Sequence, residues 1–95
     1  MSVIISPKTA AETQQRAFAK GSLPKSVIVM GDLAGVEAIA INVIDSAGNA
    51  NVLYDIDGVA VTLTATAQPL GIDFPIVLQF VKPETVGAVG LEMVD

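Results

Sequence analysis

Apolar side chains recur at every second position over most of the chain from residue 26 onward. Ile39, Ile41 and Val43 alternate with smaller or polar residues in the segment 37–44. The same alternation recurs in 59–66, 74–82 and 88–93. A period of two that is rich in β-branched residues is typical of antiparallel strands with one buried face. The sequence therefore predicts an all-β protein.

Turn-forming residues separate the alternating segments. Asp57-Gly58 is a tight-turn pair, and loops are expected at 46–49, 68–71 and 82–85. Short strands separated by turns every roughly 8–12 residues favour a sandwich or a barrel. We expect an antiparallel β-sandwich, Ig-like or of a related type, with about six or seven short strands. Its core is expected to contain Ile39, Ile41, Val61, Leu63, Leu78 and Phe80.

The two parts of the chain carry opposite net charge. Residues 1–25 have a net charge of +3, because Glu12 is the one acid beside four cations. These cations are Lys8, Arg16, Lys20 and Lys25. Residues 26–95 have a net charge of −8, because Lys82 is the one cation among nine acids, and the two parts sum to −5. The basic part is either a solvated tail or a segment that docks on an acidic surface, such as a neighbouring copy.

The N-terminal quarter lacks the clear alternation of the rest. We expect residues 1–14 to form an N-terminal arm and residues 15–95 to form a single β-sandwich domain. In this reading a strand near 15–20 turns at 21–24 into the segment 27–30. A helix over 8–20 is the alternative, since Pro7 and Gly21 stand where helices often begin and end.

The composition argues against catalysis. Histidine and cysteine are both absent, so the common nucleophilic arrangements lose their base or their nucleophile, and the usual zinc sites lose their ligands. We expect no enzyme activity, no catalytic residues, no metal and no cofactor. A loose calcium site near Asp45, Asp55 and Asp57 is an open alternative. Neither nucleic acid nor membrane is an expected partner, because the acidic body repels phosphate and acids interrupt every apolar stretch.

The outward positions of the predicted strands are unusually apolar. Only 16% of the residues are charged, against roughly 25% in an average domain. Solvated faces of antiparallel sheets are normally polar, so small or apolar residues there indicate a surface that another subunit covers. The candidate partner-contact residues are Ala38, Ala40, Val77 and Val81 on this face, with the cations Lys8, Arg16, Lys20 and Lys25.

The order of turns and strands over residues 31–94 resembles that of small structural proteins of tailed-bacteriophage virions, including the head-decoration or cement type. The resemblance rests on the turn 31–37 before Ile39 and Ile41, on Asp57-Gly58 before 60–66, on the Pro75-containing strand, and on Lys82-Pro83 before 87–90. It implies a β-rich, self-associating protein that binds the outer capsid lattice and catalyses nothing. The basic N-terminal quarter has no counterpart in it.

These observations lead us to expect a non-enzymatic virion structural protein, a capsid decoration protein that oligomerises and stabilises the shell. Its partners would be the major capsid protein or another virion protein and further copies of itself, with a trimer favoured. We expect it in the virion after synthesis in the host cytoplasm, since the N-terminus has no basic leader. A tail or neck location is an alternative. A different class, an adhesin- or fibre-associated module that binds sugar or a host protein, would depend on Tyr54.

Overall fold

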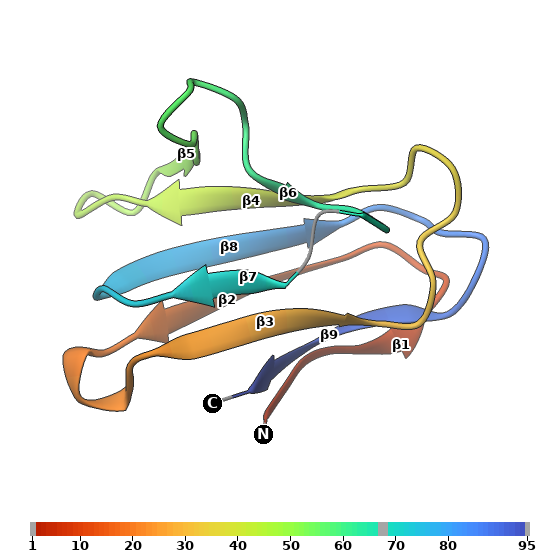
Figure 1. Ribbon diagram of the computed structural model, residues 1–95, viewed down its shortest axis with the longest axis horizontal. Coiled ribbons are helices and arrows are strands. Elements are labelled where there is room, and N and C mark those ends of the chain that lie inside the picture. The colour runs from red at the N-terminus through yellow and green to blue at the C-terminus, as the bar shows by residue number, and fades with distance from the viewer. Residues whose placement is uncertain (1, 67–68, 95) are drawn as a thin grey trace.

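Two antiparallel β-sheets face each other in the computed structural model, which describes residues 2–66 and 69–94 (Figure 1). Sheet A has the order β1 (Ser2–Lys8), β9 (Val89–Val94), β3 (Lys25–Met30) and β7 (Leu70–Ile72). Sheet B has the order β2 (Glu12–Phe18), β8 (Ile76–Lys82), β4 (Ile39–Ile44) and β5 (Ala50–Val52), and β6 (Thr62–Leu63) also pairs with β4. A 3-10 turn, η1 (Lys20–Ser22), connects β2 to β3. The predicted all-β antiparallel sandwich is confirmed, with nine strands in the described residues instead of six or seven.

The core lies between the two sheets and follows the predicted alternation. Ile39, Ile41, Leu63, Leu78 and Phe80 are each at most 1% exposed, and Val61 is half-buried against them. Sheet A supplies the opposite side of the core. Its buried side chains are Ile4, Ile5, Val27, Ile72, Val89 and Leu91.

The predicted N-terminal arm is wrong for the described residues 2–14. β1 pairs with β9 in sheet A, and β2 begins at Glu12 and pairs with β8 in sheet B. The register of β1 shifts between Val3 and Ile5, and this irregularity buries the adjacent residues Ile4 and Ile5 together. A bulge breaks the period of two, so alternation alone does not reveal the strand. The alternative helix over 8–20 is also absent, because β2 occupies that segment.

Two other predicted strands are shorter than their sequence patterns. Of the segment 59–66 only β6 is a strand, and Val59 is 60% exposed. β8 starts at Ile76 rather than at residue 74, because Pro75 has no N–H for the ladder. The predicted tight turn is confirmed: the Gly58 N–H donates to the carbonyl oxygen of Asp55 at 3.0 Å, and Gly58 has a φ of +79°.

The strands run along the long axis of the molecule and define two ends (Figure 1). One end carries the β1–β2 turn and the loops 31–38 and 83–88. The opposite end carries η1, the turn 45–49 between β4 and β5, and the segment 73–75 between β7 and β8. In the described part of the chain, no helix is long and apolar enough to cross a membrane.

Candidate docking face

The outer face of sheet B carries no charged side chain at its paired positions. Residues directly opposite one another in an antiparallel sheet lie on the same face, so the register identifies the whole face. One row across the sheet is Gln15, Gln79, Asn42 and Val52, and the next is Thr13, Val81, Ala40 and Thr62. The pairs Ala17 with Val77 and Ile44 with Ala50 extend the face. All of these residues are uncharged, although the chain has 15 charged residues in total, 5 basic and 10 acidic.

The predicted interface residues lie on or beside this face. Ala40 and Val81 are directly opposite each other, and Val77 lies on the same face of β8, across from Ala17. Ala38 directly precedes β4 and is half-buried, like the other three. The structure therefore places three of these residues on the outer face of sheet B and Ala38 directly beside it, and their contact with a partner stays a prediction.

Neutral polar groups occupy the centre of this face. The Asn42 side-chain amide donates to Gln79 Oε1 at 3.0 Å, so the two amides already satisfy part of each other's hydrogen bonding. A partner that docks on this face does not have to desolvate a charged group of sheet B, and desolvation of charges is the largest cost of burying a polar surface.

The outer face of sheet A differs in one respect. Glu92 lies in the middle of it, directly opposite Val3 on β1 and Ile28 on β3. A partner covering this face would have to bury a carboxylate or supply a cation for it. Sheet B is therefore the better docking face of the two.

The four predicted cations do not form one cluster. Lys8 makes an ion pair with Glu12 across the β1–β2 turn, and Arg16 lies further along β2. Lys20 belongs to η1, and Lys25 is the first residue of β3. Their docking on an acidic surface stays a prediction, and they are distributed over β1, β2, η1 and β3 rather than along an arm.

Side chains on the inner side of β2 form a polar ladder at the edge of the sandwich. The Gln14 amide donates to Glu12 Oε2 at 2.9 Å, and the other oxygen of this carboxylate accepts from Lys8. Arg16 Nη1 donates to the carbonyl oxygen of Gln15 at 2.9 Å and lies 3.5 Å from Gln14 Oε1. The hydrogen bond from Lys8 is the main cause that lowers the pKa of Glu12.

Lys82 is buried, with 1% of its surface exposed, and sequence reasoning missed it. Its Nζ atom donates to the carbonyl oxygens of Ala10 at 2.8 Å and Pro83 at 3.1 Å. It also donates to Thr85 Oγ1 at 3.0 Å. Burial lowers the pKa of Lys82, and the charge of Glu37 opposes that shift. Its position in phase with Leu78 and Phe80 on β8 is the sequence signal that could have found it.

Thr85 and Glu37 extend these contacts to the neighbouring loops. Thr85 Oγ1 donates to the carbonyl oxygen of Gly87 at 2.8 Å, and the Thr85 N–H donates to the carbonyl oxygen of Thr9 at 2.9 Å. The Glu37 carboxylate accepts from the N–H groups of Ala34 at 2.8 Å and Val86 at 2.9 Å. These two bonds, Ala34 first, lower the pKa of Glu37. Hydrogen bonds thus join three loops at this end.

The acids of the open calcium alternative lie in two separate turns. Asp45 Oδ1 accepts from the N–H groups of Ala47 and Asn49, and the bond from Asn49 is the largest cause that lowers the pKa of Asp45. Asp55 Oδ1 accepts from the N–H groups of Asp57 and Val59. Within residues 2–66 and 69–94, acidic side chains do not gather in a group of three that could hold a metal ion.

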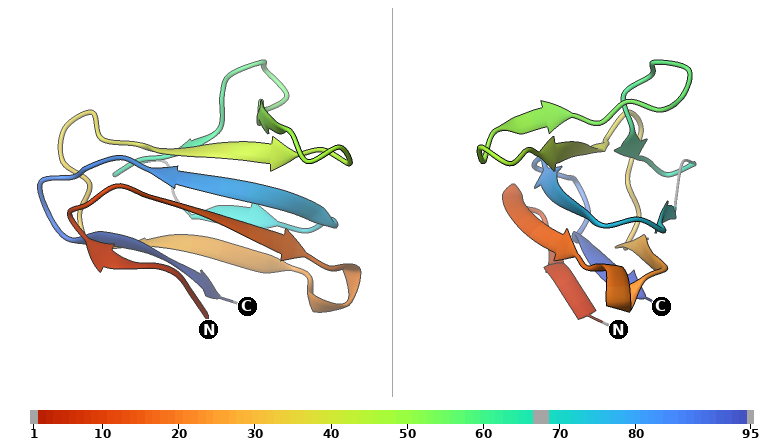
Figure 2. Two further views of the ribbon diagram at one scale, coloured as in Figure 1. Left: turned by 180° about the vertical axis from the view of Figure 1, so that it is seen from behind. Right: turned by 90° about the vertical axis from the view of Figure 1, so that its left-hand side faces the viewer.

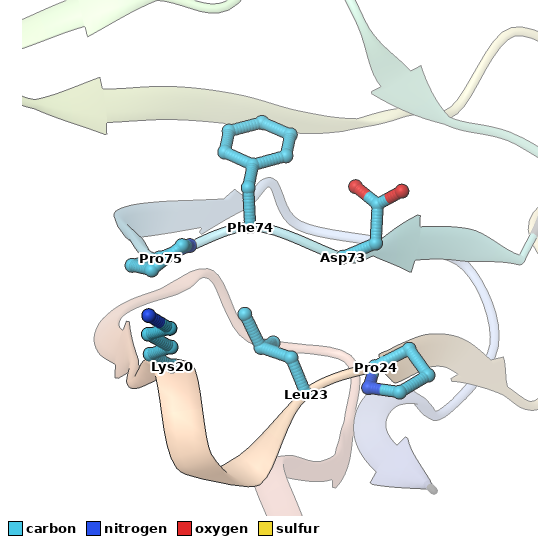
Figure 3. Close-up of a pocket in the computed structure, with 6 residues that line it drawn as sticks. All are labelled: Lys20, Leu23, Pro24, Asp73, Phe74 and Pro75. Carbon is cyan, nitrogen blue, oxygen red and sulfur yellow. The ribbon is translucent and has the colours of Figure 1, made fainter.

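An open cavity of about 590 Å³ lies at the end that carries η1 (Figure 3). Asp73, Phe74 and Pro75 line it from the segment before β8. Lys20, Leu23 and Pro24 line it from the segment between β2 and β3. Its apolar walls and two charged residues offer a contact surface, and they present no nucleophile beside a base.

Comparisons with protein-family models, with curated proteins and with solved structures gave no match.

Proposed function

We propose that this chain is a non-enzymatic structural protein of a tailed-phage virion, a capsid decoration protein that binds the shell through the outer face of sheet B. The observation that carries the docking is the absence of charge from the paired positions of that face. The assignment to a virion rests on the resemblance of residues 31–94 to small phage structural proteins. The major capsid protein is the proposed partner.

The proposed mechanism is stabilisation by burial. Covering apolar surface contributes about 25 cal/mol per Å² removed from water, so a contact over Ala40, Val77 and Val81 is individually modest. A decoration protein repeats this contact many times over one lattice, and each copy ties together the capsid subunits beneath it. The rigid strands present the contact residues at fixed positions, which lowers the ordering cost of docking.

Particle composition provides the first test. Purified virions from a lysate that produces the chain should contain it in a copy number comparable to that of the major capsid protein, as measured by quantitative mass spectrometry. Absence from the particles would overturn the virion assignment. A few copies per particle would instead place the protein at the tail or neck and overturn decoration.

A matched pair of variants tests the face itself. Val81→Lys and Ile28→Lys each replace a half-buried, outward-facing aliphatic residue with lysine, the first on sheet B and the second on sheet A. We expect Val81→Lys to abolish co-sedimentation with capsids that lack the protein and Ile28→Lys to preserve it. Circular dichroism confirms that both variants are folded. Equal binding by the two variants would contradict docking through sheet B.

One observation favours a second candidate, the sugar- or protein-binding module. Tyr54 is 60% exposed at the base of a hairpin whose tip residue, Ile56, is fully exposed. An exposed aromatic ring on a projecting hairpin is a surface on which a sugar ring can stack. Glycan-array binding that is lost in Tyr54→Ala would support this function, and an array without binding would reject sugar as the ligand.

A further inference from the structure

We propose that two copies of this chain pair edge to edge through β2, so that two sheets B form one continuous antiparallel sheet around a two-fold axis centred on Gln14. This pairing is independent of the proposed docking on a capsid. It uses the edge of sheet B and leaves the outer face free.

β2 is an unusually regular edge strand. It has seven residues, all of which pair with β8 in unbroken register, and it contains no proline. It lies at the near side of the left view of Figure 2, and in the described part of the chain no strand pairs with its other edge. A regular, unpaired edge is a template for another strand.

The other edge strands carry features that discourage pairing. β1 contains Pro7 and two shifts of register against β9. β5 and β7 have three residues each, and β6 has two. Short strands, proline and bulges are the usual means by which proteins block their sheet edges. β2 is protected only by the charges on its inner side, Glu12 and Arg16.

Those charges match each other in one particular register. In an antiparallel pair centred on Gln14, Glu12 of one copy lies opposite Arg16 of the other, and the two-fold axis repeats this ion pair. Centring the pair on residue 12 or 16 would instead oppose two like charges. Opposite charges directly across a strand pair stabilise it, whereas like charges destabilise it. The charge pattern therefore selects both self-association and its register.

The existing polar ladder is compatible with this contact. The two carboxylate oxygens of Glu12 accept one hydrogen bond each in the monomer, from Lys8 and Gln14, and a carboxylate has about four lone-pair positions. Arg16 has further N–H groups beside the Nη1 atom that bonds within its own strand. The pairing also continues the uncharged face, because Thr13 of one copy lies opposite Gln15 of the other. A two-fold contact makes a dimer, in contrast to the trimer that the phage resemblance favours.

Single cysteines test the register, since the chain has none of its own. Gln14→Cys places two sulfur atoms at the two-fold axis, within reach of a disulfide. Thr13→Cys is the matched control: residue 13 lies opposite residue 15 of the other copy, and it is more exposed than Gln14. Under mild oxidation we expect a disulfide-linked dimer about tenfold faster for Gln14→Cys than for Thr13→Cys. Random collisions between monomers would instead link the more exposed cysteine, that of Thr13→Cys, faster. Equal or faster linkage of Thr13→Cys would therefore overturn the proposal.

Charge variants test the ion pairs by light scattering. Wild-type protein is expected at about twice the mass of one chain, and Arg16→Glu should weaken dimerisation about tenfold, because each Glu12 then faces a second carboxylate instead of a guanidinium. The double variant Glu12→Lys, Arg16→Glu should recover most of that loss. A wild-type chain that is monomeric at high protein concentration, or an Arg16→Glu variant that dimerises like the wild type, would overturn the proposal. Circular dichroism verifies that each variant is folded.

Discussion

At the end of the sandwich that carries the β1–β2 turn and the loops 31–38 and 83–88, hydrogen bonds hold the loops, whereas at the other end apolar side chains border an open cavity. The bonded end centres on Lys82, which is 1% exposed and donates only to neutral oxygens. The open end has Phe74, which is 54% exposed and lines the cavity together with Leu23. The two ends close the same small core by different means.

The difference follows from the residues that each end contributes. At the bonded end Leu33 anchors loop 31–38 in the core, whereas Val36 and Val86 are 101% and 83% exposed. Hydrophobic burial therefore does little to hold loop 83–88, and polar contacts from Lys82, Thr85 and Glu37 hold it instead. Loss of a polar group should therefore be costly at the bonded end, and loss of an apolar group should matter moderately at the open end.

The largest expected effect is that of Lys82→Met. Methionine keeps most of the volume but removes every N–H that now satisfies Ala10, Pro83 and Thr85. A fully buried acceptor left without a donor costs about 1–3 kcal/mol, and the bonds to Ala10 and Pro83 are only part-buried. We therefore expect the free energy of unfolding to fall by about 3 kcal/mol in total, as measured by urea denaturation. Lys20→Met, at the exposed η1, should change it by less than about 0.5 kcal/mol. Equal effects of the two variants would contradict the difference between the ends.

The substitution Thr85→Val should have the next largest effect on stability. It removes the hydroxyl that accepts from Lys82 and donates to the carbonyl oxygen of Gly87. Because valine has nearly the same shape as threonine, the substitution removes mainly these hydrogen bonds. The free energy of unfolding should therefore fall by about 1–2 kcal/mol. Thr9→Val is the control, since Thr9 is exposed and contributes its carbonyl oxygen, which the substitution keeps. If thermal melting shows the two variants to be alike, the Thr85 hydroxyl does not hold the loops.

The sequence predicts well those elements in which one pattern governs the whole strand. Ile39 and Ile41 in β4, and Leu78 and Phe80 in β8, alternate without interruption, so their burial follows from the period of two alone. The alternation does not predict β1, because the bulge in this strand buries two successive isoleucines. β2 is misjudged because its inner side meets the polar edge of the sandwich, so only Phe18 carries an apolar signal.

The candidate site is predictable to the same extent. Ala40, Val77 and Val81 lie in regular strands, so their common face follows from the alternation. That β2 joins the face with Thr13, Gln15 and Ala17 depends on the strand order, which the sequence does not reveal. The contacts of Lys82 and Glu37 join loops far apart in the chain, and only the packing of both sheets brings these loops together.

The substitution Phe74→Ala tests how much apolar packing at the open end contributes to stability. Phe74 borders the open cavity and also a smaller apolar hollow of about 100 Å³ with Leu53 and Ile72. Phe74 is already 54% exposed, so Phe74→Ala should lower the free energy of unfolding by about 1 kcal/mol. This is well below the roughly 3–5 kcal/mol that the same substitution costs at a fully buried phenylalanine. Thermal melting measures it, with Val36→Ala as the control for an exposed side chain. A loss above that of Thr85→Val would show that apolar packing matters as much at the open end as the polar contacts do at the bonded end.

The smallest expected effect is a pH dependence that belongs to the bonded end. The N–H groups of Ala34 and Val86 lower the pKa of Glu37 in the folded protein below its ordinary value of 4.5. The folded state therefore binds a proton less readily than the unfolded state, so this stabilisation is complete above pH 4.5 and is lost as the pH falls through the lowered pKa. Glu37→Gln removes the titration, so its melting temperature should lie slightly below that of the wild type at pH 7.

The gap between Glu37→Gln and the wild type should narrow as the pH falls from about 5 to 3. The comparison must use this difference rather than the wild-type curve alone, because Glu12 and Asp45 also have lowered pKa values and add to acid sensitivity in the same direction. Glu84→Gln, at the same end of the sandwich, controls for the loss of one negative charge. A gap for Glu37→Gln that stays constant down to pH 3 would show that the shape of the side chain, and not its charge, joins loops 31–38 and 83–88.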